Sequence, residues 1–288
     1  MIARIVLITA AAVMVCLTSA ACGGDDAGSG KAVVAGFYPL AFAAEQIGGA
    51  GVSVRNLTPA GAEPHDLELT ARDVEAVQEA DLVLYLGGGF MPGLERAVAD
   101  REGPSLDLLE GQELVPGEDG EDVLDPHVWL DPVRYAEMVR AIGAGLGEDA
   151  AANALAGRLD ELDADFERGL ATCERRQIVT SHAAFGYLAK RYGLEQVPLE
   201  GLSPEAEPSA QGIEELVRLV EDAGVTTVFF ETLVSPKLAE TVAREAGVRT
   251  AVLNPLEGLT EDEVAAGADY FFVMRDNLAA LRTALGCE

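Results

Sequence analysis

The sequence of 288 residues is poor in basic residues, in histidine and in tryptophan. It has 20 lysines and arginines against 49 aspartates and glutamates, with three histidines and one tryptophan. The formal net charge of −29 argues against a nucleic-acid partner, because such a surface repels a phosphate backbone. The same charge concentrates cations near the protein, although many acidic surfaces serve only solubility.

The sequence also lacks a long apolar run. The run 5–17 is shorter than the roughly 20 residues that span a membrane. Arg4 precedes it and the small residues 19–21 follow it, which is the layout of an export signal over residues 1–22. We therefore expect an exported protein.

Residues 17–22 resemble a bacterial lipobox, in which the cysteine is acylated and becomes the first residue of the mature chain. Cys22 is then the lipid attachment site. Ser19 stands where a lipobox usually has a large apolar residue, so ordinary cleavage without a lipid stays open as an alternative. Residues 23–30 are rich in glycine and aspartate and predict a flexible tether.

Cysteine is scarce as well, with four in the chain. Cys16 leaves with the export signal, and Cys22 is committed to the lipid if the lipobox is used. Cys173 and Cys287 remain, and two surviving thiols in an oxidising compartment predict a disulfide. Two buried free thiols are the alternative.

Apolar strand patterns alternate with helical patterns along most of the chain, which predicts parallel sheets covered by helices. We expect an α/β fold of two lobes, with residues 31–147 and 174–288 joined by one long rigid helix within residues 148–173. The apolar residues of that helix recur at helical spacing over 149–172. Residues 110–125 break the pattern and predict a mobile acidic loop, which either gathers metal ions or is merely solvated.

The three histidines lie in ordered surroundings. His127 lies in the run D-P-H-V-W-L-D-P, whose prolines stiffen the backbone on both sides, and His65 follows Pro64. His182 follows a predicted strand, where the loops of a parallel sheet gather ligands. Each histidine alone fits a structural role, but together they predict one metal site. Three neutral imidazoles suit Zn²⁺ better than Mn²⁺ or Mg²⁺, which favour oxygen donors.

Several motifs resemble the metal-binding lipoproteins of bacterial zinc and manganese ABC importers, the cluster A-I solute-binding proteins. The likeness covers nearly the whole mature chain and rests on P-H-D-L-E, P-H-V-W-L-D-P, S-H-A-A-F-G-Y, F-F-E and L-N-P-L, at residues 64–68, 126–132, 181–187, 229–231 and 253–256. The resemblance implies two lobes joined by one long helix, with modest closure and ordering of loops on metal binding.

The resemblance also implies that His65, His127 and His182 are metal ligands. The manganese members typically have a carboxylate at the third position, so His182 indicates the zinc branch. The family's fourth ligand is usually an acid in an L-D-P-like run, where this chain has Asn254. Either Asn254 or a water completes the site, or Glu231 swings in; otherwise Glu231 holds an imidazole from the outer shell.

We therefore expect an extracytoplasmic, monomeric protein, anchored to the cell membrane by an N-terminal lipid, that captures Zn²⁺ and delivers it to an ABC import permease. A zinc-dependent hydrolase is the first alternative, although the sequence contains neither H-E-x-x-H nor G-x-S-x-G. A manganese-binding or adhesin-type member of the same family is the second alternative.

Overall fold

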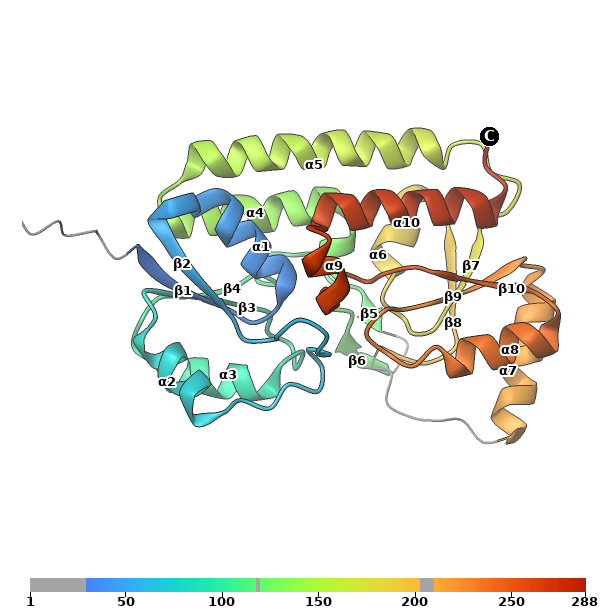
Figure 1. Cartoon of the computed structure of the whole chain (residues 1–288), viewed down its shortest axis with the longest axis horizontal. Coiled ribbons are helices and arrows are strands. Elements are labelled where there is room, and N and C mark those ends of the chain that lie inside the picture. The colour runs from blue at the N-terminus through green and yellow to red at the C-terminus, as the bar shows by residue number, and fades with distance from the viewer. Residues whose placement is uncertain (1–29, 118–119, 203–209) are drawn as a thin grey trace, which may run out of the picture.

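Two parallel four-stranded sheets form the frame of the molecule, side by side beneath a layer of long helices (Figure 1). The computed structural model describes residues 30–117, 120–202 and 210–288. The first sheet, in the order β2-β1-β3-β4, consists of β1 (Lys31–Ala35), β2 (Val52–Asn56), β3 (Leu82–Tyr85) and β4 (Ser105–Asp107). The second, in the order β10-β9-β7-β8, consists of β7 (Gln177–Thr180), β8 (Glu195–Pro198), β9 (Thr227–Phe230) and β10 (Arg249–Val252).

The two sheets share one connectivity, in which the first strand of each pairs with its second and third strands and the fourth joins the third. All of these pairings are parallel. The predicted α/β fold of two parallel sheets flanked by helices is confirmed. The carboxyl ends of the two sets of strands supply the loops that hold the site described below.

Helices cover the sheets and bridge them. The helices that follow the first-sheet strands are α1 (Tyr38–Gly48), α2 (Ala71–Glu79) and α3 (Pro92–Ala99), and a 3-10 turn, η1 (Gly49–Gly51), follows α1. The corresponding helices of the second sheet are α6 (Gly186–Tyr192), α7 (Ala210–Ala223) and α8 (Lys237–Ala246). The upper layer of Figure 1 contains α4 (Pro132–Leu146), α5 (Asp149–Gly169) and α10 (Tyr270–Leu285), and the short helix α9 (Glu261–Ala265) lies near the centre of the view. A 3-10 turn, η2 (Val128–Leu130), directly precedes α4 in the chain.

Local sequence signals explain where several helices begin. Thr70 and Asp73 form a reciprocal capping box at the start of α2. Asp131 caps α4 by accepting from the backbone amide of Val133 at 2.9 Å, and Pro132 occupies the first turn, where a missing amide hydrogen has no cost. The η2–α4 junction is thereby fixed four residues after His127.

The long helix α5 runs beside α4 and α10 (Figure 1). Leu155, Leu159, Leu162 and Phe166 form its buried face, as the helical spacing predicts. The helix begins at Asp149 but ends at Gly169, before the predicted end at residue 172. Its 21 residues span about 32 Å at the usual rise per residue.

An ion-pair cluster joins α5 to α6 and to the start of α4. The Nε and Nη2 atoms of Arg191 lie 2.5 Å from the two carboxylate oxygens of Asp163, and Nε lies 3.6 Å from Asp131 Oδ1. Burial raises the pKa of the Asp163 carboxyl, but hydrogen bonds from Arg191 and Tyr192 outweigh it and lower that pKa overall. One guanidinium therefore contacts carboxylates from two other elements.

The predicted disulfide between Cys173 and Cys287 is present, with 114 residues of sequence separation. It joins the segment after α5 to the C-terminus after α10, at the end of those helices farthest from the first sheet (Figure 1). The two longest helices of the upper layer are thus covalently joined at one end.

Residues 110–125 differ from the predicted loop. They contain an antiparallel hairpin of β5 (Pro116–Gly117) and β6 (Gly120–Leu124), and Leu114 and Val115 pack against the main core. The amide of Asp125 donates to the carbonyl of Val115 at 3.0 Å, which closes the base of the hairpin. Local sequence could not predict this hairpin, because a residue distant in the chain, Tyr187 of α6, accepts a hydrogen bond from the Val115 amide and fixes it in place.

The predicted export signal, Cys22 and nearly all of the tether lie outside the described residues. Among the residues that are described, no helix combines the length and apolar character needed to cross a membrane.

Candidate metal centre

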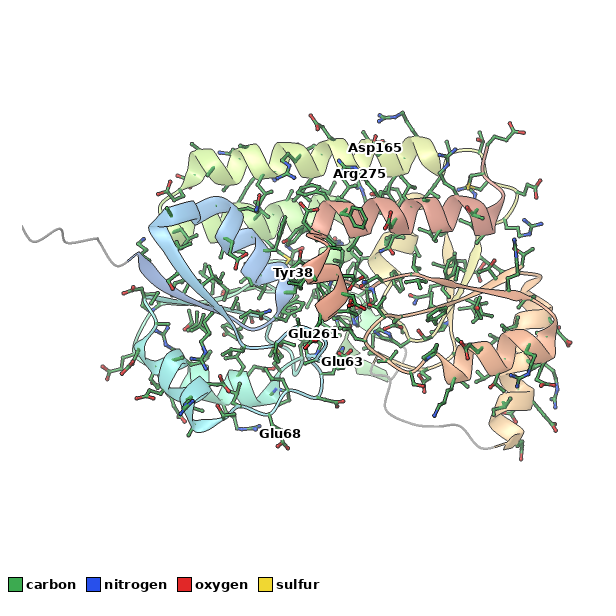
Figure 2. The ribbon with its side chains drawn as sticks, in the orientation of Figure 1. Tyr38, Glu63, Glu68, Asp165, Glu261 and Arg275 are labelled. Carbon is green, nitrogen blue, oxygen red and sulfur yellow. A yellow bond between two sulfur atoms is a disulfide. The ribbon has the colours of Figure 1, made fainter. Side chains whose placement is uncertain are left out.

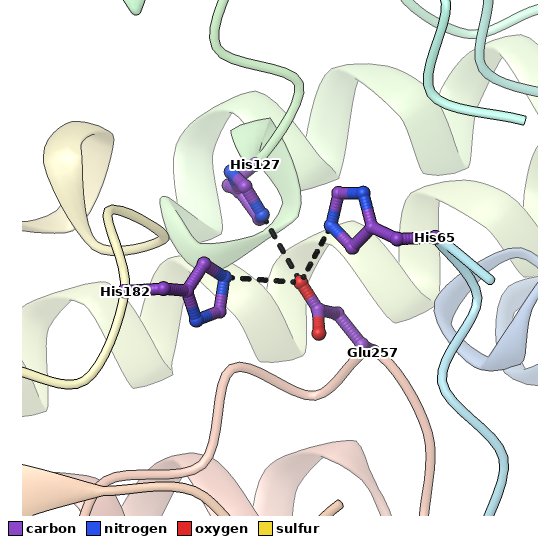
Figure 3. A group of neighbouring side chains, drawn as sticks. All are labelled: His65, His127, His182 and Glu257. Carbon is purple, nitrogen blue, oxygen red and sulfur yellow. Dashed lines mark hydrogen bonds and ion pairs between the residues drawn. The ribbon is translucent and has the colours of Figure 1, made fainter. Parts of the chain in front are cut away.

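Three imidazoles and one carboxylate converge at the seam of the two sheets. His65, His127, His182 and Glu257 each offer one ligand atom, and these atoms lie within 4.8 Å of one another (Figure 3). Glu257 Oε1 lies 3.0 Å from His127 Nε2 and 3.4 Å from the Nε2 atoms of His65 and His182. All three rings therefore present the same nitrogen to one small volume.

His127 is oriented by Asp125, two residues before it. Asp125 Oδ1 accepts from the His127 backbone amide at 2.9 Å and lies 2.8 Å from Nδ1 of the ring. With Nδ1 engaged, Nε2 is the nitrogen left for a metal. Burial alone would lower the pKa of His127, but hydrogen bonds with Asp125 and Glu257 raise it overall.

His182 is oriented in the same way from the second sheet. It follows β7, and its Nδ1 lies 2.6 Å from Oε1 of Glu231, which follows β9. The Ser181 hydroxyl donates to the same carboxylate oxygen. Burial opposes the charged imidazole, but Glu231 and Glu257 outweigh it and raise the pKa of His182 well above its ordinary value.

His65 lies on the loop between β2 and α2 and is held more loosely. Its ring packs edge-on against Phe90, with 4.7 Å between ring centroids, and its backbone amide donates to Glu63 at 3.3 Å. Within the described chain, no hydrogen bond joins its Nδ1 to a carboxylate. Its side chain is 11% exposed, whereas those of His127, His182 and Glu257 are fully enclosed.

Glu257 is positioned by the loop after β10. Leu256, immediately before it, has φ +56° and is the one residue other than glycine with a positive φ in the described chain. This left-handed backbone costs a leucine roughly 1–2 kcal/mol, so surrounding contacts must hold it. Asn254 Oδ1 accepts from the Leu256 amide at 2.7 Å, and Trp129 Nε1 donates to the carbonyl of Pro255 at 2.7 Å.

Charge compensation explains how a carboxylate stays in this enclosed place. Burial would raise the pKa of Glu257, but the three histidines, His182 foremost, hold it well below its ordinary value. Burial raises the pKa of Glu63 to about 9, and the negative charge of Glu257 adds to that shift. Glu63 lies at the seam, whereas Glu68 of the same loop points outward (Figure 2).

Several polar atoms of this cluster are buried without a hydrogen-bond partner among the described residues: His65 Nε2, His182 Nε2, Glu257 Oε2, Glu231 Oε2 and Glu63 Oε2. Such atoms are rare in folded proteins and call for an explanation. A divalent cation bound to the three Nε2 atoms and to Glu257 Oε1 would explain the two unpartnered nitrogens.

The three histidines predicted from the sequence come together, and Glu231 holds the ring of His182. The side chain of Asn254, a predicted candidate for the fourth ligand, does not join the group of ligand atoms. Its Nδ2 instead donates to Thr232 and Glu263, each at 3.1 Å. Sequence reasoning missed Glu257, three residues later. A signal was available, because Glu257 is an acid in the loop that follows a parallel strand, but the left-handed turn that directs it inward was not foreseen.

Comparison with known proteins identifies the family to which this chain belongs. The model of the ZnuA family, described as zinc-uptake complex component A, periplasmic, matches residues 33–284. The chain belongs to this family. The high-affinity zinc uptake system protein ZnuA of Bacillus subtilis is 34% identical over 300 residues, covering 93% of this chain and 94% of its own length.

Zinc-binding protein AdcA of Streptococcus pyogenes is 37% identical over 283 residues, covering 87% of this chain but 55% of its own length. The chain thus spans about half the length of this relative. The zinc-bound ZnuA-like domain of Streptococcus pneumoniae AdcA superimposes with a TM-score of 0.77 at 36% identity, covering 89% of this chain and 99% of that domain. The two-lobed fold of this chain is therefore the same as that of a family member whose structure has been solved.

Proposed function

We propose that this protein captures Zn²⁺ outside the cytoplasm and delivers it to an ABC import permease. The observation that carries the proposal is the convergence of three Nε2 atoms and one carboxylate oxygen within 4.8 Å. In this proposal His65, His127, His182 and Glu257 are the ligands. Asp125 and Glu231 orient two of the imidazoles from the outer shell.

The donor set favours zinc over manganese. Three imidazole nitrogens and one carboxylate oxygen form a four-coordinate site of the kind that Zn²⁺ adopts. Manganese prefers more oxygen ligands and a higher coordination number. A manganese-binding role is thus the weaker alternative for this cluster.

The same donor set argues against the zinc-dependent hydrolase. Catalytic zinc sites typically have three protein ligands and keep the fourth position open for water or substrate. Here Glu257 takes the fourth position, and three of the four ligands are fully enclosed. Such a site holds an ion as cargo instead of exposing it to a substrate.

The proposed location follows from the export signal and the lipobox-like residues 17–22. We propose that Cys22 carries the lipid and that the folded part acts as a monomer on the outer side of the membrane. Mass spectrometry of the membrane-bound protein, with Cys22→Ser as the control, tests the anchor, and light scattering tests the monomer.

Competition with a chromophoric zinc chelator tests the site. We expect His182→Ala to weaken zinc binding by more than about 100-fold, since even outer-shell changes commonly cost 10–100-fold. Asn254→Ala should cost less, because its side chain is not a ligand and acts on the site only through the Leu256 turn that carries Glu257. Equal losses in the two variants would contradict the ligand set.

Two further measurements separate the functions. A strain without the gene should grow poorly in zinc-depleted medium and recover when the parent chain, but not His182→Ala, is restored. The zinc-loaded protein should not hydrolyse ester or peptide substrates. Steady hydrolysis that is lost in His127→Ala would favour the enzyme instead.

A further inference from the structure

One side chain of α6, that of Tyr187, makes hydrogen bonds to the backbone of the segment that leads to His127 in the other half of the molecule. Tyr187 is almost fully buried, and its hydroxyl donates to the carbonyl of Asp125 at 2.8 Å. The same hydroxyl accepts from the amide of Val115 at 3.1 Å. Since the Asp125 amide donates to the Val115 carbonyl, the three residues form a closed set of hydrogen bonds.

This set lies on a short path between two metal ligands from different halves. Asp125 stands two residues before His127 and also holds its ring. Tyr187 stands five residues after His182, in the first turn of α6. The hydroxyl therefore connects the backbone beside one ligand to the helix that begins just after the other.

The surroundings of Tyr187 allow little freedom. The guanidinium carbon of Arg134 lies 4.8 Å from the centroid of its ring. Gly186 lets the α6 backbone come close to Asp125, because a Cβ there would lie 2.8 Å from Asp125 Oδ2. Burial raises the pKa of the Tyr187 hydroxyl to about 12, so it stays a donor at neutral pH.

The other side of His127 is also tied to the second half. Trp129 Nε1 donates to the carbonyl of Pro255, and the Tyr270 hydroxyl donates to the carbonyl of Trp129, each at 2.7 Å. His127 thus lies between two anchored positions, 125 and 129. Tyr187 provides the anchor on the side of the carboxylate that orients the ring.

We propose that Tyr187 is a positioning residue for zinc binding, which sets the place of the Asp125–His127 pair relative to His182 before the ion arrives. A site whose ligands are held in place loses less freedom on binding and binds more tightly. This inference rests on the proposed function of the same site.

The test compares Tyr187→Phe with Tyr192→Phe. Both tyrosines belong to α6 and both substitutions remove a buried hydroxyl, but the Tyr192 hydroxyl donates to Asp163 of α5 at 2.9 Å. Tyr187→Phe should weaken zinc binding about tenfold, which the loss of one or two neutral hydrogen bonds of ordinary strength would produce. Tyr192→Phe should stay close to the parent.

A spectroscopic measurement distinguishes positioning from general destabilisation. In the Co²⁺-loaded protein, the visible d–d bands report the geometry of the ligands. They should change in Tyr187→Phe and stay unchanged in Tyr192→Phe, even if the two metal-free variants unfold at similar temperatures.

Parent-like zinc affinity and cobalt bands in Tyr187→Phe would overturn the inference, as would equal losses in the two tyrosine variants. Either result leaves the proposed function intact as long as the parent binds zinc. A parent chain that binds no zinc would instead overturn the proposed function.

Discussion

His127 and His182 differ from His65 in how their rings are held. Each of the first two is enclosed, with a carboxylate on Nδ1 supplied by its own half of the molecule. His65 lies on a loop, is partly exposed and packs its ring against Phe90. The difference teaches that the site has a fixed part, made by His127, His182 and Glu257, and an adaptable part at its rim.

The largest effect expected from the difference between His65 and the two enclosed histidines is the pH dependence of zinc affinity. Zinc must displace protons from His127 and His182, whose pKa values are raised, so affinity should fall as pH drops. The fall should begin above the ordinary imidazole value of about 6.5 and reach up to roughly tenfold per pH unit for each proton displaced. Chelator competition between pH 8 and pH 6 measures it.

The difference between His65 and the two enclosed histidines provides a control for that experiment. His65→Ala should bind more weakly at every pH but keep a steep pH dependence, because His127 and His182, whose pKa values are raised, remain in place. A flat profile in the parent would contradict a site built on these histidines.

The metal-free protein should show the opposite trend in stability. Groups with a raised folded pKa stabilise the fold below their unfolded pKa, and that contribution is lost as pH rises through the folded pKa. The contribution of His127 and His182 to the free energy of unfolding should therefore decline above neutral pH. Urea unfolding in the presence of a chelator measures it, and saturating zinc should reverse the decline.

The next largest effect concerns Asp125 and Glu231, whose carboxylates contact the Nδ1 atoms of His127 and His182. Asp125→Asn and Glu231→Gln should each weaken zinc binding about 10–100-fold, the usual cost of losing an outer-shell partner. Glu63→Gln is the matched control, because the raised pKa of Glu63 makes a neutral amide a close substitute for its protonated form. Calorimetry measures all three, and a Glu63→Gln loss as large as the others would show that a carboxylate with no contact to an imidazole ring matters as much as the two that hold the rings.

The smallest effect on zinc should come from the disulfide. Replacing Cys173 and Cys287 together by alanine should lower stability by up to about 4–5 kcal/mol in the chain-entropy model, and often by less. Zinc affinity should hardly change, because the bridge lies at the end of α10 remote from the seam (Figure 1). Thermal unfolding and chelator competition on the same sample check both points.

Much of this architecture could be predicted from local sequence. The alternation of apolar strands and amphipathic helices predicts the two parallel sheets, and the helical spacing of Leu155 to Phe166 predicts the buried face of α5. The three histidines stand out because the chain contains no others and each follows a proline or a strand end. These features depend on neighbours in sequence.

The missed features depend on distant contacts. Glu257 follows a left-handed backbone at Leu256, and contacts from Asn254 and Trp129 help to hold that turn. The hairpin of β5 and β6 pairs few residues, and its base is fixed by Tyr187, 72 positions from Val115. The local sequence marks Glu257 as an acid in a loop after a strand, but propensity and periodicity reveal neither its inward turn nor the hairpin.

The continuous helix α5 constrains how an ion can be unloaded. It packs against α4 and α10, and Arg191 of α6 contacts Asp163 in its C-terminal half. A continuous helix that is packed in this way resists a hinge motion that would move the two halves apart. We therefore expect exchange with a transporter to be a local event at the partly exposed His65, so that the speed of handover depends on the loop between β2 and α2 while the rest of the carrier keeps its shape.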